Sequence, residues 1–78
     1  MNDFIKERND ALRSLDKNKI LDYCNKHGMK MPEDEELFWA GVHKAIVNIY
    51  FRSNDITMEE FDRSMEWLNK HGFSPDIV

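Results

Sequence analysis

The stretch DEELFWAGVHKAIVNIYF, residues 34–51, constrains the fold of this chain more than any other part of the sequence. Its apolar residues recur every three or four positions, the spacing that places side chains on one side of an α-helix. A weaker apolar stripe lies nearly opposite the first. A helix that is apolar on two sides is covered from both, so residues 34–51 are predicted to form a long central helix. The main stripe consists of Phe38, Gly41, Val42, Ala45, Ile46 and Ile49, and the second of Leu37, Ala40, Val47 and Phe51.

Shorter helices are predicted on both sides of this stretch in the sequence, and no segment shows the strict alternation that is typical of a strand. Asp16 is placed to cap the second helix, and Thr57 with Glu60 forms a capping box at the start of the last one. Met58, Phe61, Met65 and Leu68 mark the side of the last helix that we expect to be buried. The chain of 78 residues is therefore predicted to be one all-α domain, residues 1–78, with four helices at about 3–14, 17–27, 34–51 and 58–71.

The tetrapeptide NKHG occurs twice, at Asn25–Gly28 and at Asn69–Gly72. Each copy follows the last periodic residue of a predicted helix, where a left-handed glycine ends the helix at low cost. A duplicated module is the alternative, but the apolar register is lost upstream, where Lys17 would correspond to Phe61. A metal site formed by Cys24, His27 and His71 lacks the paired ligand spacing of zinc sites. We interpret both copies as helix stops and expect no bound metal.

The charge of the chain is divided unevenly along its length. The formal net charge is −4, and residues 1–31 carry seven basic against five acidic side chains, while residues 32–78 carry four against ten. Without a basic stripe, direct binding to nucleic acid is disfavoured. The single cysteine, Cys24, allows no internal disulfide, and neither a signal peptide nor a membrane span is indicated. We expect a cytoplasmic protein.

The sequence offers little that resembles a catalytic site. Glu36, His43 and Tyr50 share one line of the central helix and could be written as an acid–base relay, but no candidate nucleophile or phosphate-binding loop accompanies them. A histidine at the edge of the core is the commoner arrangement. Arg8 lies within the apolar side of the first helix, and we expect its guanidinium to reach Asp34 or Glu35. The chain is predicted not to be an enzyme and to use no cofactor.

Aromatic and apolar residues outside the main stripe are the candidates for binding a partner. Tryptophan is enriched among the residues that dominate protein–protein interfaces. Trp67 lies away from the centre of the buried stripe of its helix, and Trp39 lies at the margin of the central helix's apolar side. The second stripe of the central helix could form a homodimer surface or contact another helix of the same chain. The candidate partner-binding residues are therefore Trp67, Trp39, Leu37, Val47 and Phe51.

The segment MPEDEELFWAGVHKAI, residues 31–46, resembles a stretch of small uncharacterised helical proteins encoded on bacterial mobile elements and prophages. The resemblance covers the turn before the central helix and the helix's first half. It transfers no activity and no catalytic residue. It implies a cytoplasmic accessory protein that inhibits or regulates a protein of the host or of the element.

These observations favour a small non-enzymatic protein–protein interaction module. It would dock onto a protein partner, or onto a second copy of itself, through an apolar and aromatic patch rimmed by acids. The alternative is a regulator of nucleic-acid transactions, either a degenerate helix-turn-helix or an acidic inhibitor of a DNA-binding partner. The second helix argues against the former, since it carries Asp22 and no paired arginine, asparagine or glutamine face for reading bases.

Overall fold

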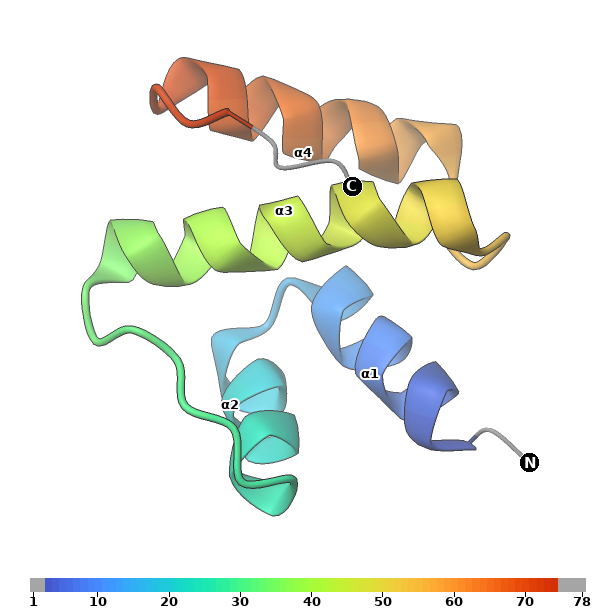
Figure 1. Ribbon diagram of the computed structural model, residues 1–78, viewed down its shortest axis with the longest axis vertical. Helices are drawn as coiled ribbons and strands as arrows, with labels where there is room; N and C mark the ends of the chain where they lie inside the picture. Colours follow the sequence, from blue (N-terminus) through green and yellow to red (C-terminus); the bar gives the residue numbers. More distant parts are fainter. Residues whose placement is uncertain (1–2, 75–78) are drawn as a thin grey trace.

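The long third helix lies at the centre of the computed structural model, which describes residues 3–74, with side chains from residue 5 onward. Figure 1 shows α4 along one side of α3, and α1 and α2 together on the other. This arrangement confirms the predicted all-α fold with a long central third helix. All regular structure within residues 3–74 is helical: α1 spans Asp3–Ser14, α2 Lys17–Lys26, α3 Glu35–Arg52 and α4 Met58–Lys70.

The predicted N-terminal caps are confirmed in atomic detail. The Asp16 carboxylate accepts hydrogen bonds from the backbone N–H groups of Asn18 and Lys19 at the start of α2. At the start of α4, the Thr57 hydroxyl accepts the backbone N–H of Glu60, whose carboxylate accepts the backbone N–H of Thr57. These side chains satisfy N–H groups that have no partner inside the helix, so local sequence fixes where each helix begins.

Both NKHG copies end their helices as predicted, and His27 and His71 are the C-cap residues. Gly28 has a φ of 69° and Gly72 a φ of 79°. The N–H of the next residue, Met29 or Phe73, donates to the carbonyl five residues earlier at 2.8 Å in each case. Together with the bonds from the glycine N–H groups, this is the double hydrogen-bond pattern of the Schellman motif. The repeated tetrapeptide is thus the same terminator used twice.

The three glycines provide a matched test of this interpretation. A Cβ at Gly28 or Gly72 would contact nothing within 4 Å, so alanine there meets only the backbone penalty of a positive φ. Gly28→Ala and Gly72→Ala are each expected to lower the free energy of unfolding by about 1 kcal/mol. Gly41→Ala, inside α3, is expected to raise it by about 0.5–1 kcal/mol, because the new Cβ makes only an ordinary 3.8 Å contact with Met31. Urea denaturation measures all three; a loss at Gly41 or a gain at Gly72 would contradict the assignment.

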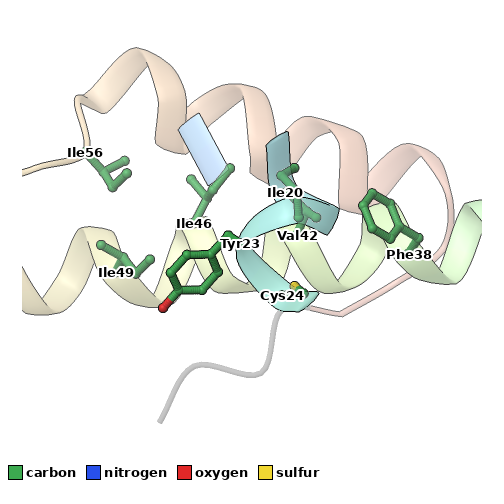
Figure 2. Close-up of a cluster of buried hydrophobic side chains, with 8 residues drawn as sticks. All are labelled: Ile20, Tyr23, Cys24, Phe38, Val42, Ile46, Ile49 and Ile56. Atoms are coloured by element: carbon green, nitrogen blue, oxygen red, sulfur yellow. The ribbon is translucent and has the colours of Figure 1, made fainter. Parts of the chain in front are cut away.

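Two clusters of buried side chains lie on different sides of α3. In the larger one, shown in Figure 2, the apolar side of α2 faces the main stripe of α3, and Ile56 closes one end. The smaller cluster, Ala40, Val47 and Leu68, joins α3 to α4 and is covered in part by Phe61, Met65, Trp67 and Phe73. The central helix is therefore apolar on two sides because two layers pack on it. The members of the larger cluster are Ile20, Tyr23, Cys24, Phe38, Val42, Ile46, Ile49 and Ile56.

Candidate protein-docking surface

Val47, one of the predicted partner-binding residues, is fully buried, with 0% of its surface exposed. It packs with Ala40 against Leu68 of α4. The middle of the second stripe of α3 is therefore used inside the chain, and Val47 is not available to a partner. Sequence alone left this alternative open, and the structure assigns Val47 to the core.

Trp67 is half-buried, and its ring belongs to a stack within the chain. The ring centroid of Trp67 lies 4.8 Å from that of His43, 4.0 Å from that of His71 and 6.0 Å from that of Phe73. His71 in turn lies 3.2 Å from the Glu36 carboxylate of α3. The stack of the Trp67 ring on His43 and His71 thus joins α4 to α3 within the chain.

Trp39 is also half-buried, and a hydrogen bond orients its ring. Its Nε1 donates to Glu35 at 2.9 Å, and the other carboxylate oxygen of Glu35 receives Lys17 Nζ at 2.6 Å. The hydrogen bond from Lys17 and, to a smaller extent, that from Trp39 hold the pKa of Glu35 below its ordinary value. Trp39 therefore packs against the larger core cluster, and Glu35 links it to Lys17 at the start of α2.

Leu37 and Phe51, the other two predicted residues, are exposed on the solvent side of α3. Their exposed fractions are 49% and 56%. Lys44 lies midway between them in sequence, so the three residues are spaced by seven and follow one line along the helix. The Phe51 ring contacts Phe61 of α4, with their centroids 5.4 Å apart and their planes perpendicular. This contact makes the exposed apolar surface continuous from one helix to the other.

Met58 extends this surface on α4 and is the most exposed large apolar residue described, at 64%. The sequence had assigned Met58 to the buried side of its helix, and this was wrong. Met58 is the first residue of α4, and the helical spacing that unites it with Phe61 and Met65 does not reveal whether another helix reaches that far. We define the α3–α4 face as Leu37, Lys44, Phe51, Met58, Phe61 and Met65.

The two edges of the α3–α4 face carry opposite charge. Glu59, Asp62 and Glu66 line a shallow hollow on the outside of α4 together with Arg63, Met65 and Asn69, so three acids against one arginine leave this border of the face acidic. On the α3 edge, Lys44 lies 5.9 Å from the centroid of the Phe73 ring, and Arg52 ends the helix beside Phe51. The expected acidic rim is therefore present along α4 only, whereas the α3 edge is basic.

His43 forms a buried polar link between α3 and α4. The residue is only 5% exposed, and its Nδ1 lies 2.9 Å from the hydroxyl of the buried Ser64, with which it forms a hydrogen bond. Burial, the nearby His71 and Arg63 lower the pKa of His43 to about 4. The imidazole is consequently neutral at physiological pH.

Glu36, His43 and Tyr50, which share one line of α3, each contact a different residue in or at the end of α4. Glu36 pairs with His71, His43 bonds Ser64, and the Tyr50 ring stacks on Phe61 with centroids 4.4 Å apart. All three contacts bind α3 to α4. Their shared line thus reflects the helix–helix interface.

Cys24, His27 and His71 are not brought together either. Cys24 is buried in the larger core cluster, and burial raises the pKa of its thiol. His27 lies against the Tyr23 ring and 3.6 Å from Glu7, while His71 is on α4 beside Glu36. Within the described part of the chain, no three His, Cys, Asp or Glu side chains gather as a metal ion would require.

Arg8 does not reach Asp34 or Glu35, and that prediction was wrong. Its Nε and Nη2 both donate to the side-chain carbonyl of Asn9 at 3.1 Å. Asn9 is almost fully buried, and its amide donates to Asp55 in the α3–α4 loop at 2.7 Å. This chain of polar contacts anchors α1 to the loop. Sequence reasoning missed Asn9 and Asp55 because neither carries a local signal that identifies a partner 46 residues away.

None of the helices in the described residues has both the length and the apolar composition needed to cross a lipid bilayer. Comparisons with protein-family models, with curated proteins and with solved structures gave no match to this chain.

Proposed function

We propose that this chain is a small non-enzymatic protein–protein interaction module that docks through the α3–α4 face. The observation that carries this proposal is the exposure of Phe51 and Met58 beside Phe61 at one end of the α3–α4 face, and of Leu37 at the other end. Phe61 and Met65 pack on the buried cluster that joins the two helices. Single exposed apolar residues are normal, but a contiguous group on a domain this small is typical of an interaction site.

The energetics favour a partner on this face. Complete burial of a Leu, Phe or Met side chain is worth about 1.5–3 kcal/mol. The three exposed residues are about half to two-thirds exposed, so a partner that covered them would recover a large part of that value for each. The face also offers a fixed backbone, since α3 and α4 are joined by the buried cluster beneath it. Little ordering is then needed on binding.

Affinity capture with a matched pair of variants tests the proposal. Phe51→Ser/Met58→Ser removes two exposed apolar side chains from the face, and we expect it to reduce capture of the specific partner at least about tenfold while the circular dichroism stays that of a folded helical protein. Ile5→Ser is the control, because Ile5 is also exposed but lies on α1. If the parent, the double variant and the Ile5→Ser control captured equal, quantified amounts of partner, this face would be refuted as the docking site.

The ion pairs of α1 and α2 argue against the alternative function, a regulator of nucleic-acid transactions. Four of the seven basic side chains in residues 1–31 are held by carboxylates, which lowers the charge available for phosphates. A DNA shift assay separates the two proposals, since clear binding at about 100 mM salt would favour the alternative. The pairs are Lys6–Asp10, Arg13–Glu60, Lys17–Glu35 and Lys26–Glu7.

The resemblance of residues 31–46 to proteins of mobile elements suggests where such a partner would be found. In an accessory protein of an integrated element, the docking face would meet a protein of the host or of the element. Capture is therefore best performed in the native host.

A further inference from the structure

We propose that one partner of the α3–α4 face is a second copy of this chain, packed face to face about a two-fold axis that runs parallel to α3 and α4. The inference rests on the proposed function, because it names the occupant of the same surface. Two-fold dimers use the same patch on both copies, so the patch must be complementary to itself. The α3–α4 face meets this condition in both its apolar residues and its charges.

The position of each residue along the common direction of α3 and α4, here called its level, determines which side chains of the two copies would come into contact. Contacts within the chain place the last turn of α3 beside the first turn of α4, as in Phe51–Phe61, and the first turn of α3 beside the end of α4, as in Glu36–His71. Rotation about an axis parallel to the helices keeps each residue at its level and exchanges the two helices. Phe51 then lies over the partner's Met58, and Leu37 over the partner's Phe73.

The same rotation brings opposite charges together. Arg52 meets the partner's Glu59, and Lys44 meets the partner's Glu66, because the basic edge on α3 lies over the acidic edge on α4. Each contact occurs twice in the dimer. The other face-to-face arrangement, with the axis across the helices, would place Lys44 near the partner's Lys44. Such like-charge juxtaposition is unfavourable, so electrostatics select the first arrangement.

The size of the face indicates a weak and reversible dimer. An 18-residue helix is about 27 Å long, and two neighbouring helices cover a width of about 20 Å. The face thus amounts to roughly 500 Å² on each copy, and a dimer would bury about 1,000 Å² in total, which is at the lower limit of specific interfaces. We expect dissociation in the micromolar range or weaker, with marked dependence on salt.

Charge reversal tests the pairing directly, by sedimentation velocity over a series of protein concentrations at about 100 mM salt. The first variant, Lys44→Glu/Arg52→Glu, makes both edges acidic, and the second, Glu59→Lys/Glu66→Lys, makes both edges basic. We expect the parent to shift from monomer to dimer as concentration rises, and each variant alone to need at least about tenfold more protein. An equimolar mixture should dimerise at the parent's concentrations, because each acidic edge then meets a basic one.

The control variant Lys19→Glu/Lys30→Glu changes the net charge as much as the first variant does, but both residues are exposed outside the face. It should dimerise like the parent. A monomeric parent, variants that dimerise unchanged, or a mixture that stays monomeric would each overturn the inference. A monomeric parent whose partner capture still depends on Phe51 and Met58 would overturn the self-association alone and leave the proposed function standing.

Discussion

Val47→Asp is expected to prevent this chain from folding. Val47 is fully buried between α3 and α4, where a carboxylate would have neither solvent nor a cationic partner. Such a substitution lowers the free energy of unfolding by several kilocalories per mole, because an unpaired charge is desolvated and packing around Leu68 is lost. A domain of 78 residues has a total stability of only about 5 kcal/mol. The helical circular dichroism should fall strongly, and no cooperative transition should be seen on heating.

Leu37→Asp is the matched control for this experiment. It places the same charge on the same helix, at a residue that is 49% exposed and lies in the first turn, where the helix dipole favours an acid. Its free energy of unfolding should remain within about 0.5 kcal/mol of the parent value. A folded Val47→Asp with the parent's melting temperature would show that Val47 is not between the two helices.

Mild acid is expected to destabilise the folded chain through His43. The pKa of His43 is about 4 in the folded protein and about 6.5 in the unfolded chain, so the unfolded state binds more protons between these values. The contribution of neutral His43 to the free energy of unfolding is therefore fully present above about pH 6.5 and is lost as the pH falls toward 4. The loss amounts to about 2 kcal/mol at pH 5 and about 3 kcal/mol at pH 4.

Urea denaturation at pH 7.5 and pH 5 measures this effect with little interference from carboxylates. The hydrogen bond from Lys26 lowers the pKa of Glu7, and that from Lys17 lowers the pKa of Glu35. Protonation of these two carboxylates therefore weakens the fold only below about pH 4.5. His43→Asn cannot titrate in this range, and its side-chain oxygen can still accept the Ser64 hydroxyl. This variant should lose about 2 kcal/mol less than the parent between the two pH values.

A second variant separates pH dependence from general weakening. Ile46→Val removes one methyl group from the core and should lower stability by about 0.5–1.5 kcal/mol at both pH values. Its difference between pH 7.5 and pH 5 should equal that of the parent. If His43→Asn also kept the full pH difference, the acid sensitivity would belong to another group.

The helix boundaries were largely predictable because their signals are local. The Thr57–Glu60 capping box, the Asp16 cap and the two NKHG terminators each act within about five residues of backbone. The largest shifts were of one residue: at the C-caps His27 and His71, at Asp34, which caps α3 rather than starting it, and at Arg52, which ends α3 one residue later than predicted. A helix end satisfies its own backbone groups with nearby side chains, so no knowledge of the rest of the fold is needed.

The candidate surface was predictable only in part, because helical spacing does not say which residues a neighbour covers. Leu37, Val47 and Phe51 belong to one stripe in the sequence, but only Val47 lies beneath α4. α4 reaches both ends of α3, since Phe51 contacts Phe61 and Glu36 contacts His71. Leu37 and Phe51 are exposed because they lie on a line of α3 that is rotated away from the side of Ala40 and Val47, which α4 covers. Helical spacing placed Trp67 away from the buried stripe of its helix, but in the structure its ring stacks with those of His43, His71 and Phe73.

By itself, the sequence determined four helices, their ends and the two-sided character of the third, because hydrogen bonds and caps within a few residues decide these features. Only the tertiary structure decided that Val47 is core while Phe51 and Met58 are surface, and that Arg8 is held by Asn9 rather than by Asp34 or Glu35. Those outcomes depend on which side of each helix a neighbouring helix covers, and on partners as distant in sequence as Asn9 and Asp55. Neither is encoded in the periodicity of any single helix.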